Sequence, residues 1–587
     1  MIAPLSGLVA ALFGAAALAL PAPEVNSLGL FERETCTNSA TSRECWSDGF
    51  DINTNFYLET PETGVEREYW LSVEEADCAP DGISRKCQTF NGTVPGPLIT
   101  ADWGDTLTIH VTNNLLDNGT TVHWHGLRQL NSSEMDGVPG VTQCPIPPGG
   151  SMTYSFRVSQ YGSTWYHSHF TFQVSEGMFG PLIINGPASS DYDEDLGLFF
   201  LQDWSHTPIM ELWARNRGGF FTLDNTLING TNTFTASDGT VTGEKYEVVV
   251  EKGKSYRLRL INVAVDGFFD FRIDGHNFTV ISTDFVPVQP YVTDSVQIGI
   301  GQRYDIVIEA NAEAANYWIR GGWNTACVAI GGSGDVSGDA TAILRYDATS
   351  TEDPTTEDTV TTMTQCFDEN KSHLIPILDV NVTNLKSVFV EDLSLSTAFH
   401  GYLTWTLNGS TLYLDWDEPT LKKVHDNNTS YDSEENIISV GNGFAADDWA
   451  VLVIDTAAIA VNHPMHLHGH DFFILAQAAG TSFDGSTDSF NLVNPTRRDV
   501  AILPANGYLA IAFQLDNPGT WLVHCHIAWH TGEGLALQFV ESPDAALTSG
   551  ALVNWDNSAW NGNGADMCAA WEEYTTNQVY PQDDSGI

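Results

Sequence analysis

Residues 524–530 read His-Cys-His-Ile-Ala-Trp-His and combine imidazole and thiolate, two side chains that transition metals bind readily. Ahead of them come two strand-like runs, residues 508–513 and 520–523, with an Asp-Asn-Pro-Gly turn at 516–519 between them. The metal-binding side chains are therefore predicted at the end of a β-strand.

The strand alternation separates these side chains into two groups. Alternate residues of an extended chain point to opposite faces, so His524 and His526 should share one face, about 6 to 7 Å apart, while Cys525 faces the other way. Cys525 and His530 supply a thiolate and an imidazole, the start of a His₂Cys copper site used for electron transfer. One strand would then serve two metal sites.

Three further histidine clusters strengthen the prediction. A lone His-x-His pair is usually chance, but four clusters in matched positions are not. Zinc prefers closed sites of four ligands, and ten histidines with one cysteine are too many for such a site, whereas several copper ions account for all of them. The further clusters are His123-Trp-His125, His167-Ser-His169 and His463-Pro-Met-His466-Leu-His468-Gly-His470.

The elements that position these residues are predicted to be β-strands. Short runs of Val, Ile, Thr, Tyr and Phe alternate with Gly, Asn, Asp and Pro. A strand-turn-strand pattern recurs at residues 150–169, 301–320 and 507–526, which predicts three related sandwich domains. The first and third copies end in histidines, whereas the middle copy ends in Trp318-Ile319-Arg320-Gly321. The middle domain should therefore space and pack the outer two.

Loop-like stretches set the predicted domain boundaries, at residues 187–190 and 349–364. We expect domains at 34–188, 189–370 and 371–587, the second without copper ligands. The apolar start ends in small residues and is too short to span a bilayer, so residues 1–20 are predicted to be a signal peptide and 21–33 a propeptide. No later stretch approaches 18 uncharged apolar residues, so the mature protein should be soluble and secreted.

The charge balance narrows the range of partners. The chain has 75 acidic and 24 basic residues, a net charge of -51, which argues against nucleic acid or an anionic membrane as partner. Solubility alone explains this charge, and adaptation to acidic or salty surroundings is the alternative. The protein is expected to be a monomer.

Cysteines and sequons indicate an oxidising, secretory route. If one of the nine cysteines, Cys525, binds metal, eight remain for four disulfides. Cys36 with Cys45 and Cys78 with Cys87 are close enough to pair locally, whereas spacing does not pair the other four. N-linked glycans are expected at the Asn-x-Ser/Thr sites Asn91, Asn118, Asn131, Asn229, Asn277, Asn370, Asn381, Asn408, Asn427 and Asn428.

The four histidine clusters, in this order and spacing, resemble those of the multicopper oxidases over nearly the whole mature chain. The chain looks most like the ascomycete fungal laccases, because of Glu34-Thr35-Cys36, the run from Asp136-Gly137 to Pro148 and the ending Asp584-Ser585-Gly586-Ile587. The resemblance implies three consecutive cupredoxin-like Greek-key β-sandwich domains. It also implies four coppers, one type 1, one type 2 and two type 3. It pairs Cys144 with Cys568 and Cys327 with Cys366, and Cys78 and Cys87 look like an addition.

The resemblance also assigns the ligands. It implies type 1 ligands at His463, Cys525 and His530, type 2 ligands at His123 and His466, and type 3 ligands at His125, His167 and His526 for one ion and at His169, His468 and His524 for the other. Leu535 falls at the axial type 1 position, where it cannot donate a lone pair, so a high potential is expected. Bilirubin oxidases carry methionine there, which counts against assigning the chain to them.

Four further residues match positions that have a function in the family or lie close in sequence to the predicted copper ligands. Asp136 would be a carboxylate near the type 2 copper that helps deliver protons, with a solvated turn residue as the alternative. Asp266 would be an acid in the phenol pocket, with a turn aspartate as the alternative. Ile587 would plug the channel to the trinuclear site rather than fray, and His470 should be structural.

Together these features predict a laccase that oxidises phenols by one electron and reduces O₂ to water. A metal-ion or ascorbate oxidase shares the copper sites and differs in the substrate pocket. A copper store without turnover would not need separate mononuclear and trinuclear sites.

Overall fold

The structure is a computed structural model. It describes residues 36–47, 49–217, 222–327, 339–360, 365–399, 401–441, 448–456, 459–548 and 567–578. The predicted signal peptide, propeptide and channel residue Ile587 lie outside these ranges. Among the described residues, no helix is both long and apolar enough to cross a membrane.

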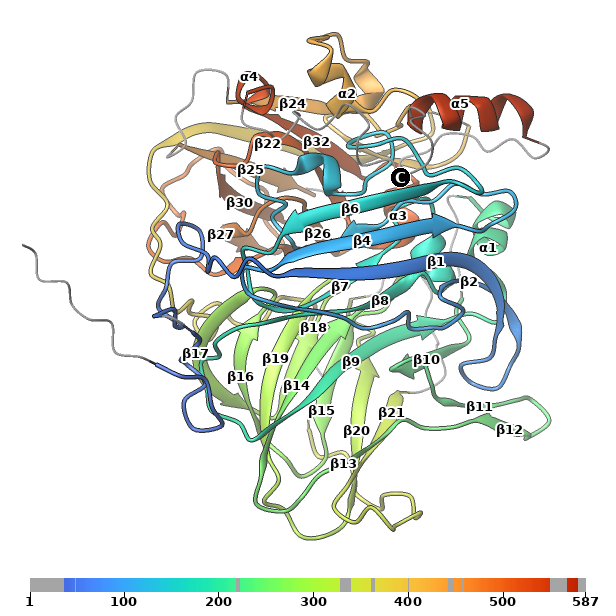
Figure 1. Ribbon diagram of the computed structural model, residues 1–587, viewed down its shortest axis with the longest axis vertical. Helices are drawn as coiled ribbons and strands as arrows, with labels where there is room; N and C mark the ends of the chain where they lie inside the picture. The colour runs from blue at the N-terminus through green and yellow to red at the C-terminus, as the bar shows by residue number, and fades with distance from the viewer. Residues whose placement is uncertain are drawn as a thin grey trace, which may run out of the picture. The chain divides into compact units, whose positions relative to one another are not determined.

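The first sandwich consists of two four-stranded sheets (Figure 1). β6 shows why these strands form, because Met152, Tyr154 and Phe156 are buried at alternate positions and pack against residues of the opposite sheet such as Leu182. One sheet has the order β2-β1-β4-β6, with β1 Glu66–Cys78, β2 Arg85–Phe90, β4 Thr106–Asn113 and β6 Ser151–Arg157. The other has the order β3-β8-β7-β5, with β3 Ile99–Asp102, β5 His123–Trp124, β7 Gly162–His167 and β8 Phe179–Asn185.

The middle sandwich pairs a six-stranded with a five-stranded sheet, and a small hairpin is attached. The larger sheet, β10-β9-β14-β19-β16-β17, comprises β9 Glu194–Trp204, β10 Asn225–Ile228, β14 Ser255–Asn262, β16 Phe278–Thr283, β17 Val286–Thr293 and β19 Arg303–Glu309. The smaller, β13-β21-β20-β15-β18, comprises β13 Glu247–Val249, β15 Phe269–Ile273, β18 Ser295–Ile298, β20 Asn316–Trp323 and β21 Ala340–Arg345. The hairpin is β11 Thr233–Thr235 with β12 Val241–Gly243.

The third sandwich has the same layout. One sheet, β23-β22-β25-β30-β27-β28, comprises β22 Leu385–Ser396, β23 Thr404–Leu407, β25 Trp449–Asp455, β27 Phe472–Ala478, β28 Arg497–Arg498 and β30 Tyr508–Gln514. The other, β24-β32-β31-β26-β29, comprises β24 Ile437–Val440, β26 His463–Leu467, β29 Val500–Leu503, β31 Gly519–Cys525 and β32 Ala536–Glu541. Helices are short: α1 Ile209–Arg215, α2 Thr420–His425, α3 Ala528–Gly532, α4 Pro543–Ala546 and α5 Met567–Asn577, with 3-10 turns η1 Ser133–Met135, η2 Gln173–Glu176 and η3 Ser433–Glu435.

The three sandwiches repeat one topology, which confirms the all-β prediction. Each has a parallel pair in its first sheet, β1 with β4, β9 with β14 and β22 with β25. Each also sends the two strands of the sequence repeat, β6 and β7, β19 and β20, or β30 and β31, into opposite sheets. One apolar cluster runs from the middle sandwich, at Leu258 and Ile306, into the third, at Ile511 and Phe513. The exact domain boundaries near residues 188 and 370 stay a prediction.

Disulfides account for the eight cysteines other than buried Cys525. Cys36 bonds to Cys45 and Cys78 to Cys87, the local pairs expected from spacing. Cys327–Cys366 and Cys144–Cys568 are the pairs implied by the family resemblance. The Cys144–Cys568 bond joins residues 424 apart and thereby ties α5 to the first sandwich.

Candidate metal centres

Strand β31 divides its metal-binding side chains between two sites, as its alternation predicts. It pairs antiparallel with β26, which places His524 opposite His466 and Cys525 opposite Met465. The Cys525 side chain belongs to one group of metal-binding atoms and His524 to another. The two groups are therefore separated by a single peptide link.

The sulfur site brings together the three residues that the sequence groups there. Cys525 Sγ lies 3.6 Å from Nδ1 of His463 and 3.6 Å from Nδ1 of His530, and the two nitrogens are 3.1 Å apart. Donors bound to one ion at about 2.0 to 2.3 Å are themselves about 3 to 4 Å apart, so this spacing fits a single metal. A thiolate with two imidazoles is the donor set of an electron-transfer copper site.

Burial shapes the electrostatics of this site. Cys525 and His463 are fully buried, whereas His530, presented by α3, is half-buried. Burial raises the pKa of the Cys525 thiol and lowers that of His530 to about 3. Without a cation the sulfur therefore keeps its proton, and a bound metal would displace it.

Two neighbours complete the sulfur site. The Cys525 N–H donates to the Leu535 carbonyl at 3.1 Å, and the Leu535 side chain is fully buried. The Trp405 ring lies 4.8 Å from the His463 ring and 4.5 Å from the His530 ring. Leu535 was predicted here from its spacing to Cys525, whereas Trp405 was not predicted.

Eight histidines form a second cluster, contributed by the first and third sandwiches. In the first, His123 on β5 is opposite His167 on β7, and in the third, His466 on β26 is opposite His524 on β31. The metal-binding atoms form triplets within 4.8 Å of one another: His123 with His466 and His468, His123 with His125 and His167, and His169 with His468 and His524. The last triplet is the set that the resemblance implies for one type 3 ion.

His526 joins this cluster through its ring, and His470 does not join it. The His526 ring lies 5.1 Å from the His125 ring and 5.8 Å from the His167 ring. His470 Nδ1 lies 3.2 Å from the His468 carbonyl, and its Nε2 lies 3.0 Å from Glu541. These contacts agree with the structural role predicted for His470.

The hydrogen bonds at His123 and His466 leave the Nε2 atom of each ring able to bind a metal. A carbonyl only accepts, so His123 Nδ1 donates to the Asp136 carbonyl at 2.8 Å and His466 Nδ1 donates to the Asp499 carbonyl at 2.7 Å. The Nε2 atoms of both rings are buried and have no hydrogen-bond partner. Buried polar atoms normally have partners, so these nitrogens fit an ion at the cluster.

Burial, followed by the neighbouring imidazoles, lowers the pKa of His466, His468 and His526 well below the ordinary value. These rings are therefore neutral, the form that binds metals. A cavity of about 30 Å³, lined by His167, His169, His524 and His526 among others, opens against them. It has room for a molecule about the size of water.

Asp136 lies in the histidine cluster and not on a solvated turn. It is fully buried, and its Oδ2 accepts from His468 Nδ1 at 2.8 Å. The positive φ of the following Gly137 brings that turn against Val122, where an added Cβ would lie 1.8 Å from the Val122 carbonyl oxygen.

Asp266 lies on a turn attached to the sulfur site. Ala528 N, on the helix that carries His530, donates to the Val265 carbonyl at 3.1 Å. Buried Asp203 accepts from the backbone N–H groups of Val265, Asp266 and Gly267 at 2.7 to 2.9 Å. Asp203 therefore fixes the turn that carries half-buried Asp266.

Sequence reasoning missed Asp203, Trp405, Arg303 and Asp499. Asp499 lies 3.3 Å from His125 Nε2, and its carboxylate is paired with Arg303. One signal was available, because the charged run Arg497-Arg498-Asp499 directly precedes the apolar strand Val500–Leu503. Buried charges of this kind need partners, so the run suggests a functional or structural ion-pair network.

Comparison with known proteins identifies the class that this fold and these sites define. Residues 72–189, 195–349 and 410–545 each match the family described as multicopper oxidase. The chain therefore belongs to the multicopper oxidases, and its three sandwiches are cupredoxin-like domains.

Individual relatives show which kind of multicopper oxidase the chain is. Laccase-2 of Botryotinia fuckeliana is 53% identical over 561 residues and covers 94% of each chain. The crystal structure of the laccase from Botrytis aclada is 53% identical, with a TM-score of 0.86, and covers 94% of this chain and 100% of that one. A solved multicopper oxidase that functions in iron import is 26% identical, with a TM-score of 0.76, and covers 88% of this chain and 97% of that one. Among multicopper oxidases, the chain is a laccase of the fungal type.

Proposed function

We propose that the chain holds four coppers in the two sites described above. The type 1 ligands are His463, Cys525 and His530, with Leu535 as a non-coordinating axial neighbour. The remaining ligands divide into His123 and His466 for type 2, His125, His167 and His526 for one type 3 ion, and His169, His468 and His524 for the other. The orphaned Nε2 atoms and the spacing at Cys525 support this assignment.

The proposed reaction is the one-electron oxidation of phenols coupled to the four-electron reduction of O₂ to water. Copper, when bound, would supply the redox chemistry at both sites. The observation that carries the proposal is that Cys525 lies between His524 and His526, so one strand connects the sulfur site to the histidine cluster.

The chain contributes binding, orientation and proton handling. His530 is the half-buried member of the sulfur site, so a phenol would reach it from solvent. Asp266, on the turn bonded to the His530 helix, would accept the hydroxyl proton. Asp136 bonds the His468 ring, where a carboxylate could pass protons to reduced oxygen.

Metal-ion oxidation is the runner-up, since the iron-import relative has the same fold. Its identity of 26%, against 53% for the Botrytis laccase, favours the phenol substrate. Ascorbate oxidation and copper storage without turnover are the remaining alternatives. Oxygen consumption measured with an oxygen electrode would separate these alternatives. A phenol should drive the fastest oxygen consumption, with four phenols oxidised per O₂. Faster oxygen consumption with ferrous iron or ascorbate would reassign the substrate, and no oxygen consumption with any of the three would indicate a copper store.

We also propose that the protein is secreted, glycosylated and monomeric. The sequon asparagines are exposed or half-buried, as attached sugars require. The disulfides fit an oxidising compartment. Glycosidase treatment followed by mass measurement, and light scattering, would test these points.

A further inference from the structure

The histidine cluster has two halves of the same construction. In one half, the Asp136 carbonyl accepts from His123 Nδ1 at 2.8 Å, and the Asp136 carboxylate accepts from His468 Nδ1 at 2.8 Å. The His123 and His468 rings are 4.0 Å apart. One aspartate thus fixes a histidine of each outer domain, one by backbone and one by side chain.

Asp499 makes a similar pair of contacts in the other half. Its carbonyl accepts from His466 Nδ1 at 2.7 Å, and its Oδ1 lies 3.3 Å from His125 Nε2. The His125 and His466 rings stack at 4.0 Å. Asp499 is therefore the structural counterpart of Asp136, with the two outer domains exchanged.

The two carboxylates differ in how firmly they are held. Asp136 Oδ1 lies 3.3 Å from His123 Nδ1, and no hydrogen bond holds it among the described residues. Both oxygens of Asp499 accept from the Arg303 guanidinium, one bond at 2.6 Å and the other shorter, and both residues are fully buried. Such a paired fork fixes the plane of a carboxylate, which one ammonium group cannot do.

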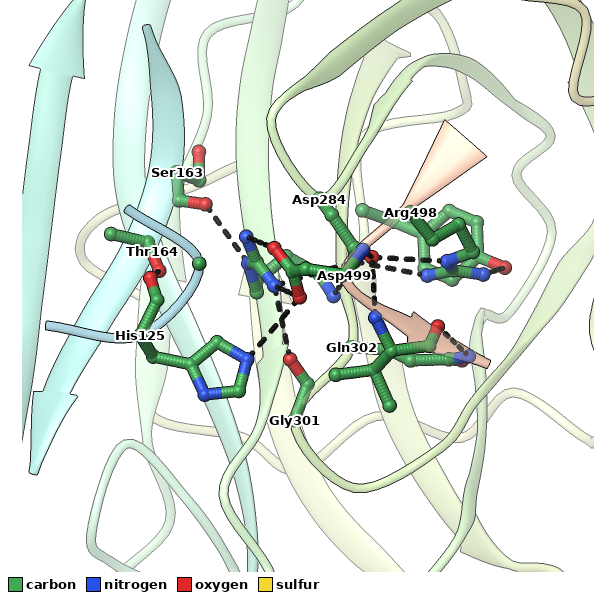
Figure 2. Close-up of polar contacts among 12 residues, drawn as sticks. His125, Ser163, Thr164, Asp284, Gly301, Gln302, Arg498 and Asp499 are labelled. Carbon is green, nitrogen blue, oxygen red and sulfur yellow. Dashed lines mark hydrogen bonds and ion pairs between the residues drawn. The ribbon is translucent and has the colours of Figure 1, made fainter. Parts of the chain in front are cut away.

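Arg303 belongs to the middle domain, which offers no ligand. It begins β19, its Nε donates to the Ser163 carbonyl of the first domain at 3.3 Å, and Asp284 lies 3.6 Å from it. Asp284 in turn accepts from the Asp499 backbone N–H at 3.0 Å. Figure 2 shows Asp499 between His125 on one side and Asp284 with Arg498 on the other.

Glycines let the middle domain reach the ligands. Gly301, at φ +84°, packs so closely that an added Cβ would lie 2.8 Å from His526 Cδ2 and 3.2 Å from His125 Cε1. At Gly126 of the first domain, directly after His125, an added Cβ would lie 2.3 Å from Asp499 Oδ2 and 2.5 Å from Nη2 of Arg303, which belongs to the middle domain. Both glycines have positive φ, which other residues rarely adopt.

We propose that Asp499, locked by Arg303 from the middle domain, is a positioning carboxylate of the trinuclear site and the fixed counterpart of Asp136. It orients His125 through its side chain and His466 through its backbone. Because Asp499 faces Nε2 of His125, that ring would offer Nδ1 to a bound metal, whereas His123 and His466 would offer Nε2. This inference rests on the proposed copper function, and it gives the ligand-free domain a direct role in that site.

The test compares Asp499→Asn and Arg303→Lys with matched controls in holoenzyme. Asp274→Asn and Arg320→Lys break another Asp–Arg fork of the middle domain, whose two bonds are both 2.8 Å and whose residues belong to none of the groups of metal-binding side chains among the described residues. Copper per chain after dialysis against a chelator, the electron paramagnetic resonance of the mononuclear type 2 ion and the visible sulfur-copper band are measured.

Both test variants should keep the visible band and retain trinuclear copper about 10- to 100-fold less tightly, with an altered type 2 signal. The double variant should lose no more than the worse single variant, because Arg303 acts through Asp499. The controls should lower only the thermal midpoint. Should Asp499→Asn fail to fold, the charge-preserving Arg303→Lys decides by the same readings.

Wild-type copper retention and type 2 signals in Arg303→Lys and Asp499→Asn would overturn the proposal, as would equal losses in the controls. If the wild-type chain binds four coppers and oxidises phenol, and the variants show the same copper retention and type 2 signal, only the positioning role is refuted. A wild-type chain that binds no copper refutes both the proposed function and this inference.

Discussion

Asp266 and His530 belong to different sandwiches and are joined beside the sulfur site. The turn that carries Asp266 accepts a backbone hydrogen bond from the helix that carries His530. The Asp203 carboxylate accepts three backbone N–H hydrogen bonds from the same turn and so fixes it. An acid and the proposed electron-accepting site are thus held together. This arrangement suits a substrate that gives up a proton as it loses an electron.

Asp266→Asn should slow phenol oxidation on the order of tenfold, or about 1.4 kcal/mol, and move its pH optimum, because the proton acceptor is lost. Water also takes this proton at an open pocket, which keeps the loss below that of an enclosed general base. Steady-state rates with a phenol across pH measure the effect.

A non-phenolic one-electron donor is the control for Asp266→Asn, since it has no proton to lose and should react at nearly the wild-type rate. Equal loss on both substrates would mean that Asp266 shapes the pocket rather than accepting a proton.

At the level of elements, the clusters of metal-binding side chains were predictable because they lie on or beside repeated strands with regular spacing. His524 and Cys525 end β31 and His526 follows it directly, and the alternation of their side chains separates the two sites. Asp499 and Arg303 were not predictable in this way, because their pairing joins β19 to the loop before β29, 196 residues apart in sequence. Such contacts depend on how the sandwiches pack, which local sequence does not encode.

Helix α5 anchors the C-terminal segment to the first sandwich. Its Trp571 is buried against Gly119, where an added Cβ would lie 2.7 Å from the ring, and the Phe170 ring lies 6.0 Å away. Together with Cys144–Cys568, this packing holds the end of the described chain in place. The tail that resembles the family's channel plug begins just beyond it, outside the described residues.

Deleting the last four residues, Asp584 to Ile587, should alter oxygen reduction and its KM for O₂ while leaving electron uptake from phenol at the sulfur site unchanged. Stopped-flow bleaching of the blue band and its recovery with O₂ separate the two half-reactions. Unchanged oxygen kinetics together with unchanged copper content would rule out the plug.

For the whole molecule, net charge and buried acids both make stability depend on pH. The net charge of -51 repels itself more strongly as pH rises. Burial also raises the pKa of Glu134 to about 8 and that of Glu391 to about 7. At these two acids the folded state therefore keeps protons that the unfolded state has lost, from about pH 4.3, the ordinary glutamate value, up to these raised values.

At Glu134 and Glu391 the unfolded state binds fewer protons in this window, so the contribution of these two acids to the free energy of unfolding should fall as pH rises through it. The lowered pKa values of the buried histidines act in the opposite direction, so Glu134 is tested by comparing the wild-type holoenzyme with Glu134→Gln, which leaves those histidines unchanged. The thermal midpoint of the wild type, relative to that of Glu134→Gln, should be lower at about pH 8 than at about pH 5. A relative midpoint that is equal or higher at the alkaline value would refute the raised pKa of Glu134.

More of the overall architecture than of the contacts between the domains could be predicted from the sequence. Three strand-turn-strand repeats, two with histidines and one without, predict three sandwiches and two copper-bearing ends. The prediction that the middle domain spaces and packs the outer two did not include the contacts that Gly301 and Arg303 make at the histidine cluster. Neither Gly301, which packs against the histidine rings, nor buried Arg303 belongs to a periodic sequence pattern, so neither contact could be predicted from the sequence.

The central claim is that Cys525 alone separates a mononuclear site from a trinuclear one, and Cys525→Ser tests it most directly. Copper content and the visible spectrum should show four coppers and a blue band in the wild type, because thiolate bound to cupric ion absorbs strongly. The variant should hold three coppers, with no blue band and no phenol turnover. A variant that stays blue, or that loses copper from both sites together, would contradict the account.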